Sequence, residues 1–172
     1  IWYNLPNKLK ALCELVECEE EVPTYNFDLT SPNWASKGVT DEASFINWLG
    51  YKGLTNIVVT DFNFVGDRIF CNMTADGIDY DLSDFGLVNA DKIGVVNGLI
   101  TLNLSRNQIV TFNPLIPLQS SLTHLTLNYN KMTLAGYTTS EAWANTQPAF
   151  TNPCSVFFMG NIDDISGTNL QA

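Results

Sequence analysis

Residues 98–113, GLITLNLSRNQIVTFN, decide the fold that this chain is expected to adopt. They contain the pattern L-x-x-L-x-L-x-x-N-x-I, in which one polar residue, Asn107, stands in an otherwise aliphatic series. The pattern has neither the period of a helix nor the alternation of a simple strand. A buried amide is tolerated where it is hydrogen-bonded, so Asn107 indicates a turn in which the amide bonds to unpaired backbone groups.

Three further copies of this pattern occur in the chain, at intervals of 23, 22 and 23 residues. They are LTNIVVTDFNF at 54–64, GIDYDLSDFGL at 77–87 and LTHLTLNYNKM at 122–132. Such a regular interval indicates stacked repeat units, each covering the exposed core of the one before. Phe62 and Phe85 replace the asparagine in the first two copies, so we expect aromatic stacking to complete that half of the series.

Three elements are expected on the amino-terminal side of the repeats. Residues 5–18 place leucines at three- and four-residue spacing, which predicts an amphipathic helix. Residues 25–30 alternate apolar and polar side chains, as in a strand with one solvent-exposed face. Thr40 is positioned to cap a short helix over residues 41–49.

On the carboxyl side, a helical-looking segment at 138–150 separates the fourth copy from a degenerate fifth. In the fifth copy Val156, Phe158 and Asn161 keep the register, 31 residues after the fourth. The chain begins at Ile1 rather than methionine and stops where SGTNLQA looks ready to open a helix. We therefore expect a fragment or a processed product.

The repeated pattern resembles the leucine-rich repeat family over residues 54–165. The resemblance implies an α/β fold, namely a short leucine-rich-repeat solenoid with a parallel β-sheet on its concave face and a mostly irregular convex side. An N-terminal helix and a C-terminal cap would close it. We expect four parts along the chain. Residues 1–22 form an N-terminal helix and acidic linker for docking, and 23–53 form an N-terminal cap of a strand and a short helix. Residues 54–137 form four repeats, and 138–172 form a truncated C-terminal cap that holds the degenerate fifth copy.

The last part of the chain has a narrower likeness. PLQSSLTHLTLNYNKMT, followed after one residue by AGYTTSEAWANTQPAFTNPCSVFFMGNIDDISGTNL, is similar to the terminal module of repeat proteins encoded by bacteriophages of Bacteroidetes hosts. That resemblance implies a virion-associated protein that helps particles attach to host or mucosal surfaces. Related modules also occur in bacterial surface proteins, so a bacterial adhesin stays open.

The composition excludes several classes of function. A hydrophobic content of 45% with 12% aromatic residues indicates a folded core rather than disorder. A formal net charge of −10 without a basic run disfavours a nucleic-acid partner, because phosphate binding needs clustered lysine and arginine. No apolar run reaches the roughly 18 residues that a membrane-spanning helix needs, so no membrane contact is expected.

The sequence gives little support for catalysis. His124 is the single histidine, and no serine or cysteine is placed by the sequence to pair with it, so we expect a protein that is not an enzyme. Cys13, Cys18, Cys71 and Cys154 lack the spacing of zinc ligands. They are expected to be buried free thiols that act as small hydrophobic residues.

The best candidate for a metal site is the acidic segment TADGIDYDLSDFG, residues 74–86. Asp79 and Asp81 would share one outward face of a strand and could hold calcium there. The order of ligands and glycine found in an EF-hand is absent, so a solvated acidic face is favoured and no cofactor is expected.

The remaining candidate site is the outward surface of the predicted parallel sheet. Short polar side chains offer many hydrogen-bond donors and acceptors at little cost in side-chain entropy, which suits a hydroxyl-rich or peptide ligand. The alternative is that they are simply good polar strand residues. The predicted binding residues on this face are Asn56, Asp79, Asp81, Asp84, Thr101, Asn103, Arg106, His124, Thr126 and Tyr129.

These observations lead to two main hypotheses of function. The first is a non-enzymatic module on a virion surface or in the extracellular space that binds glycan or protein on a cell or mucosal surface, helped by multiple copies. The second is a structural spacer or a capsid or tail assembly element, which the helix at 5–18 would dock onto other virion proteins. A bacterial cell-surface adhesin is a third alternative.

Overall fold

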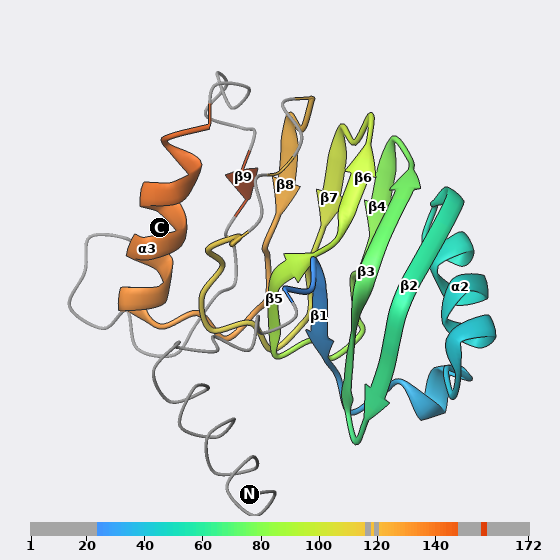
Figure 1. Ribbon diagram of the computed structural model, residues 1–172. Helices are drawn as coiled ribbons and strands as arrows, with labels where there is room; N and C mark the ends of the chain where they lie inside the picture. Colours follow the sequence, from blue (N-terminus) through green and yellow to red (C-terminus); the bar gives the residue numbers. More distant parts are fainter. Residues whose placement is uncertain (1–23, 116–117, 119–120, 148–155, 158–172) are drawn as a thin grey trace, which may run out of the picture.

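The computed structural model describes residues 24–115, 118, 121–147 and 156–157, which form two β-sheets, two α-helices and a short 3-10 helix (Figure 1). In chain order the elements are β1 (Phe27–Thr30), η2 (Ala35–Lys37), α2 (Glu42–Tyr51), β2 (Thr55–Val65), β3 (Arg68–Asp76), β4 (Asp79–Asp81), β5 (Asn89–Ile93), β6 (Val95–Asn97), β7 (Thr101–Asn103), β8 (His124–Thr126), α3 (Leu134–Ala144) and β9 (Val156–Phe157).

The larger sheet has five strands and is mostly antiparallel. Its order is β2-β3-β1-β5, and β6 pairs with β3 in parallel. β2 and β3 form a hairpin, and Gly66 in its turn has a φ of 61°, a left-handed conformation that glycine adopts readily. β3 buries every second side chain against the core: Ile69, Cys71, Met73 and Ala75.

The smaller sheet is parallel and has the order β4-β7-β8-β9. Tyr80, Leu102 and Leu125 are paired partners in β4, β7 and β8, and all three are buried. Leu125 also pairs with Val156 of β9. These registers follow the 22-, 23- and 31-residue intervals between the copies.

The predicted fold class is wrong. The first copy, residues 54–64, does not join the parallel sheet, because β2 pairs antiparallel with β3. Figure 1 shows β2 and β3 as a long hairpin, and the described sheets do not curl into a solenoid. The physical reason is local: residues 68–76 alternate buried and exposed side chains, so a hairpin partner for β2 lies directly after it in the sequence.

An aromatic cluster fills the core between α2 and the sheets. The Phe85 ring lies 4.6 Å from Trp34 and 4.7 Å from Trp48, measured between ring centroids. Phe62 lies 5.6 Å from Phe45 in the same way. The two phenylalanines that replace asparagine therefore pack against other aromatic rings, although the contacts are edge-on or tilted rather than the stacking that was predicted. Such edge and tilted contacts add to the stability gained from burial alone.

Two buried asparagines tie neighbouring copies together through their amides. Asn107 Oδ1 accepts hydrogen bonds from the backbone N–H groups of Phe85 and Leu87, at 3.1 and 3.0 Å. Its Nδ2 donates to the carbonyl oxygens of Leu82 and Leu104, both at 2.9 Å. The role predicted for Asn107 is confirmed, and it extends across copies, because three of these four partners belong to the preceding copy.

Asn130 repeats this arrangement one copy later. Its Oδ1 accepts from the Ile109 N–H at 3.1 Å, and its Nδ2 donates to the carbonyl oxygens of Leu104 and Leu127, both at 2.9 Å. The Leu104 carbonyl oxygen therefore accepts from both buried amides, which links the third and fourth copies through one backbone group.

Several predicted elements differ from the structure at their ends. Asp41, not Thr40, caps α2, and it forms a capping box with Ser44. α3 begins at Leu134, four residues before the predicted start, because the Thr133 side chain caps it. Cys71 is a buried free thiol as predicted. The helix at 5–18, the other three cysteines, Phe158 and Asn161 lie outside the described residues.

Neither described helix is both long enough and apolar enough to cross a bilayer.

Candidate binding face

The outward surface of β4, β7 and β8 carries most of the predicted binding residues. Because the central residue of each strand is buried, the residues on either side of it point to the opposite face of the sheet. The strand register aligns them in two rows, Asp79–Thr101–His124 and Asp81–Asn103–Thr126. We call these six residues the polar face.

Several groups on the polar face already have hydrogen bonds nearby. Asp81 Oδ1 accepts from the Ser83 N–H, and Asn103 Oδ1 accepts from the N–H and hydroxyl of Ser105. His124 Nδ1 lies 2.8 Å from the Thr123 hydroxyl oxygen, a contact that the sequence did not predict. These bonds hold the side chains in fixed orientations rather than consuming all of their donors and acceptors.

Other groups on the polar face have no intramolecular partner within the described residues. They are the hydroxyls of Thr101 and Thr126 and the carboxylate of Asp79, and they come from three adjacent strands. Adjacent strands lie about 4.8 Å apart, so groups on neighbouring strands are close enough to contact one small ligand at the same time. The face can therefore form several hydrogen bonds to one ligand.

Just after the strands, three residues lie in the left-handed region of backbone conformation. Asp84, Arg106 and Tyr129 have φ values of 54°, 56° and 57°, and they occupy the same place in successive copies. We call them the left-handed row. This conformation costs an L-residue roughly 1–2 kcal/mol, although aspartate and asparagine tolerate it better than arginine or tyrosine.

Charge is distributed unevenly over the site. The β4 side carries Asp79, Asp81 and Asp84, whereas the β7 and β8 side carries Arg106 and His124. The Arg106 guanidinium lies 5.9 Å from the centroid of the Tyr129 ring, which is within the range of a cation–π interaction. Arg106 forms no ion pair with any described carboxylate.

Asn56 is the one predicted binding residue that belongs to the other sheet. It lies in β2 with a φ of 50°, and its Nδ2 donates to Asp76 Oδ2 at 2.7 Å. The prediction placed it on the same face as the parallel strands. Because the first copy pairs antiparallel with β3, Asn56 instead lies near the junction of the two sheets.

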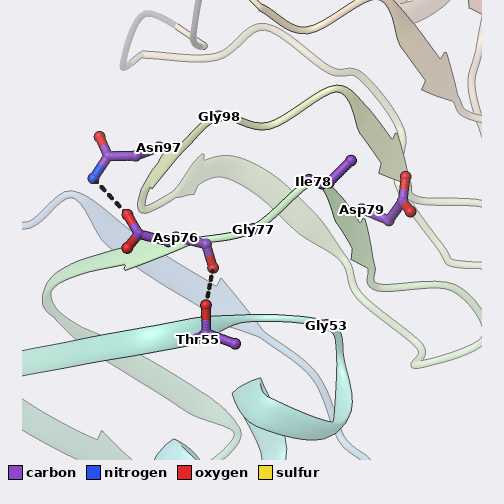
Figure 2. A pocket seen from close by; sticks show the side chains of 8 residues that line it. All are labelled: Gly53, Thr55, Asp76, Gly77, Ile78, Asp79, Asn97 and Gly98. Atoms are coloured by element: carbon purple, nitrogen blue, oxygen red, sulfur yellow. Dashed lines mark hydrogen bonds between the residues drawn. The ribbon is translucent and has the colours of Figure 1, made fainter.

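A hollow of about 510 Å³ lies at that junction, where the chain passes from β3 to β4 (Figure 2). Figure 2 shows Asn97 donating to the Asp76 carboxylate and Thr55 donating to the Asp76 carbonyl oxygen. Hydrogen bonds from Asn56 and Asn97 hold the pKa of Asp76 below its usual range. The residues that line the hollow are Gly53, Thr55, Asp76, Gly77, Ile78, Asp79, Asn97 and Gly98.

The hollow is mainly a packing seam between the sheets. A Cβ on Gly53, whose φ is 100°, would collide with the carbonyl oxygen of Asp79, and a Cβ on Gly77 would press against Leu54. Thr55 and Asn97 both donate hydrogen bonds to Asp76, so the polar groups of the hollow bond within the protein. This seam was not predicted from the sequence, although the Asp76-Gly77 and Asn97-Gly98 dipeptides are typical turn signals.

No group of three or more histidine, cysteine, aspartate or glutamate side chains in the described part of the chain is placed to hold a metal ion. Asp79 and Asp81, the pair considered for calcium, lie in different rows of the polar face.

No family model, curated protein or solved structure matches this chain. The function proposed for it therefore rests on the geometry of its own residues and on the resemblances seen in its sequence.

Proposed function

We propose that this chain is a non-enzymatic binding module that uses its polar face to hold glycan or protein on a cell or mucosal surface. The observation that carries the proposal is that Thr101, Thr126 and Asp79 point outward from adjacent strands and have no intramolecular partners among the described residues. Their hydroxyl and carboxylate groups can bond to a ligand with little loss of side-chain freedom, because threonine and aspartate side chains are short.

The backbone below the face supports this role. The buried amides of Asn107 and Asn130 connect the turns after β4, β7 and β8, so the rows keep their spacing when a ligand binds. Preorganised groups lose less entropy on binding than mobile ones. A small face of this kind gives modest affinity alone, and many copies on a particle would raise the overall strength of attachment.

The proposed setting is the surface of a bacteriophage virion, which the sequence resemblance suggests. The face would then point outward from the particle, toward host or mucosal surfaces. An inward-pointing face in an assembled particle would instead favour the alternative of a spacer or assembly element.

The test is to screen the full chain against a glycan array and a host-envelope extract, followed by paired substitutions. Thr101→Val with Thr126→Val removes two hydroxyls while keeping β-branched side chains of similar shape. We expect the double variant to lose at least tenfold in binding of any ligand found. The matched control is Thr60→Val, an exposed threonine of β2 in the other sheet, which should bind as the wild type does. Equal binding by all three proteins would reject the polar face as the site.

A further inference from the structure

The left-handed row retains side chains that its backbone does not favour. Among the described residues, six glycines have positive φ, including Gly86 and Gly98, so this chain uses glycine freely at other left-handed positions. Arginine and tyrosine nevertheless occupy the equivalent positions after β7 and β8. Strained backbone conformations of this type cluster at functional sites, where a particular side chain is needed despite its conformational cost.

The backbone conformation at these positions is fixed by hydrogen bonds between copies. The Asp84 N–H donates to the Ser105 carbonyl oxygen at 3.0 Å, and the Arg106 N–H donates to the Asn128 carbonyl oxygen at 2.8 Å. Arg106 therefore cannot relax to a more favourable φ without breaking the link to the next copy. Its side chain is held at the carboxyl end of β7, beside the polar face.

The chemistry of the pair indicates which ligand group it would take. Arg106 is exposed and has no carboxylate partner among the described residues. The single ion pair in that part of the chain joins Arg68 and Asp28. A guanidinium that has no ion-pair partner in the described part of the chain is notable where the net charge is −10. Its planar set of donors matches the two oxygens of a carboxylate. The neighbouring Tyr129 ring is 52% exposed and offers an apolar surface.

We propose that Arg106 and Tyr129 form a recognition site for the carboxylate-bearing sugar of an acidic glycan. The guanidinium binds the carboxylate, and the Tyr129 ring packs against the C–H surface of the sugar ring. Thr126 and Asn103, in the adjoining row of the polar face, hydrogen-bond to its hydroxyls. The site rests on the proposed function and adds the class of ligand. Asp84 and Asp81 on the β4 side repel the carboxylate, so the acidic sugar binds at the β7 and β8 end.

The test compares polyvalent 3′-sialyllactose with polyvalent lactose on the full chain, because these probes differ in the acidic sugar. The wild type is expected to bind the sialylated probe at least tenfold more strongly than lactose. Arg106→Gly and Tyr129→Gly should each lose at least tenfold of that binding. Arg106→Lys should keep part of it, because an ammonium group keeps the charge but lacks the planar pair of donors.

Thermal unfolding separates a recognition role from a structural one. Glycine relieves the left-handed conformation, so Arg106→Gly should unfold at an unchanged temperature or at one roughly 2–4 °C higher. Asp61→Gly is the matched control, since Asp61 has a φ of 54° in β2 and lies in the other sheet. It should bind the sialylated probe as the wild type does.

The contrary outcomes are distinct. If Arg106→Gly and Tyr129→Gly bind like the wild type while Thr101→Val with Thr126→Val does not, this site is wrong and the proposed function stands. If the wild type binds the sialylated probe and lactose equally, the acidic sugar is rejected as the ligand and the proposed function stands. The same conclusion follows if the wild type binds neither probe but does bind another ligand on the array. No ligand at all, on the array or in the extract, rejects both proposals. A clearly lower unfolding temperature for Arg106→Gly would make Arg106 part of the scaffold.

Discussion

The first and third copies of the repeat have the same apolar spacing but fold differently. Residues 54–64 form a long antiparallel strand, whereas residues 99–109 form a short parallel strand followed by a turn. The difference lies in the copy that follows each. The turn after β4 is held by Asn107 of the third copy, and the turn after β7 by Asn130 of the fourth.

The first copy would need the same amide at position 85, where Phe85 stands instead. A phenylalanine side chain cannot form hydrogen bonds with backbone groups, and the Phe85 ring packs in the aromatic cluster with Trp34 and Trp48. The second and third copies turn into the parallel sheet, and the successor of each supplies an asparagine to that turn. The first copy has no such amide in its successor, and it continues as a strand that pairs with β3.

Removal of the Phe85 ring should have the largest effect on stability, because this ring is at the centre of the aromatic cluster that takes the place of an asparagine link. Phe85→Ala leaves a cavity among buried aromatic rings and should lower the free energy of unfolding by about 4 kcal/mol. Urea denaturation followed by tryptophan fluorescence measures the change. Tyr51→Ala is the control, since Tyr51 is 90% exposed and should change stability by less than about 0.5 kcal/mol. A loss as small as that of the control would contradict the role of the cluster.

Removal of Asn107 tests the other side and should have the next largest effect. Asn107→Ala deprives four backbone groups of a partner and should lower the free energy of unfolding by about 3 kcal/mol. Hydrogen exchange should show the Phe85 and Leu87 amides losing protection while the amides of β3 keep theirs. Asn103→Ala, which removes a half-buried turn contact with Ser105, is the matched control. Uniform loss of protection across both sheets would show that they do not respond separately.

Alkaline pH should weaken the antiparallel sheet through its buried thiol. Burial raises the pKa of Cys71 to about 12, with smaller contributions from Glu42 and Asp61, above the usual 9.0. Its contribution to stability is fully present below about pH 9 and falls by up to about 1.4 kcal/mol per pH unit toward pH 12, because only the unfolded state ionises in that window. Cys71→Ala should unfold with a shallower pH dependence above pH 9. Identical slopes would contradict burial as the cause.

The exposed ion pair of the larger sheet should have the smallest effect. Arg68 donates to Asp28 from Nε at 2.8 Å and from Nη2 at 2.6 Å, but the Arg68 side chain is 52% exposed. Arg68→Ala should lower the free energy of unfolding by less than about 1 kcal/mol, and less still at about 1 M salt. Urea denaturation at low and high salt measures the difference. A loss comparable with that of Phe85→Ala would make this pair a main support of β1 and β3.

The sequence predicted the local parts of this fold better than their assembly. The alternation at residues 25–30 predicts β1, and the spacing at 41–49 predicts α2, because those signals depend on residues that are neighbours in the chain. The strand at 68–76 is not among the predicted elements, although Ile69, Cys71 and Met73 alternate with less buried residues. The repeat pattern of 54–64 predicts a parallel strand, whereas these residues pair with β3 in a hairpin that the repeat alone does not predict.

The binding site shows the same division. Nine of the ten predicted binding residues lie on or directly beside β4, β7 and β8, because the 22- and 23-residue intervals set which residues are neighbours across strands. Asn56 could not be placed correctly, since its location depends on how the first copy pairs. The left-handed conformation of Arg106 and Tyr129 could not be predicted from the sequence either, because neither residue type favours a positive φ.

The asparagine links give the chain a direction in time as well as in space. During synthesis the turn after β4 stays incomplete until Asn107 has emerged, and the turn after β7 waits for Asn130. Each unit is thus finished by the one made after it. A chain cut just before Asn107 would keep β4 and Phe85 in sequence but would leave the Phe85 and Leu87 amides exposed, ready to pair with whatever backbone comes near.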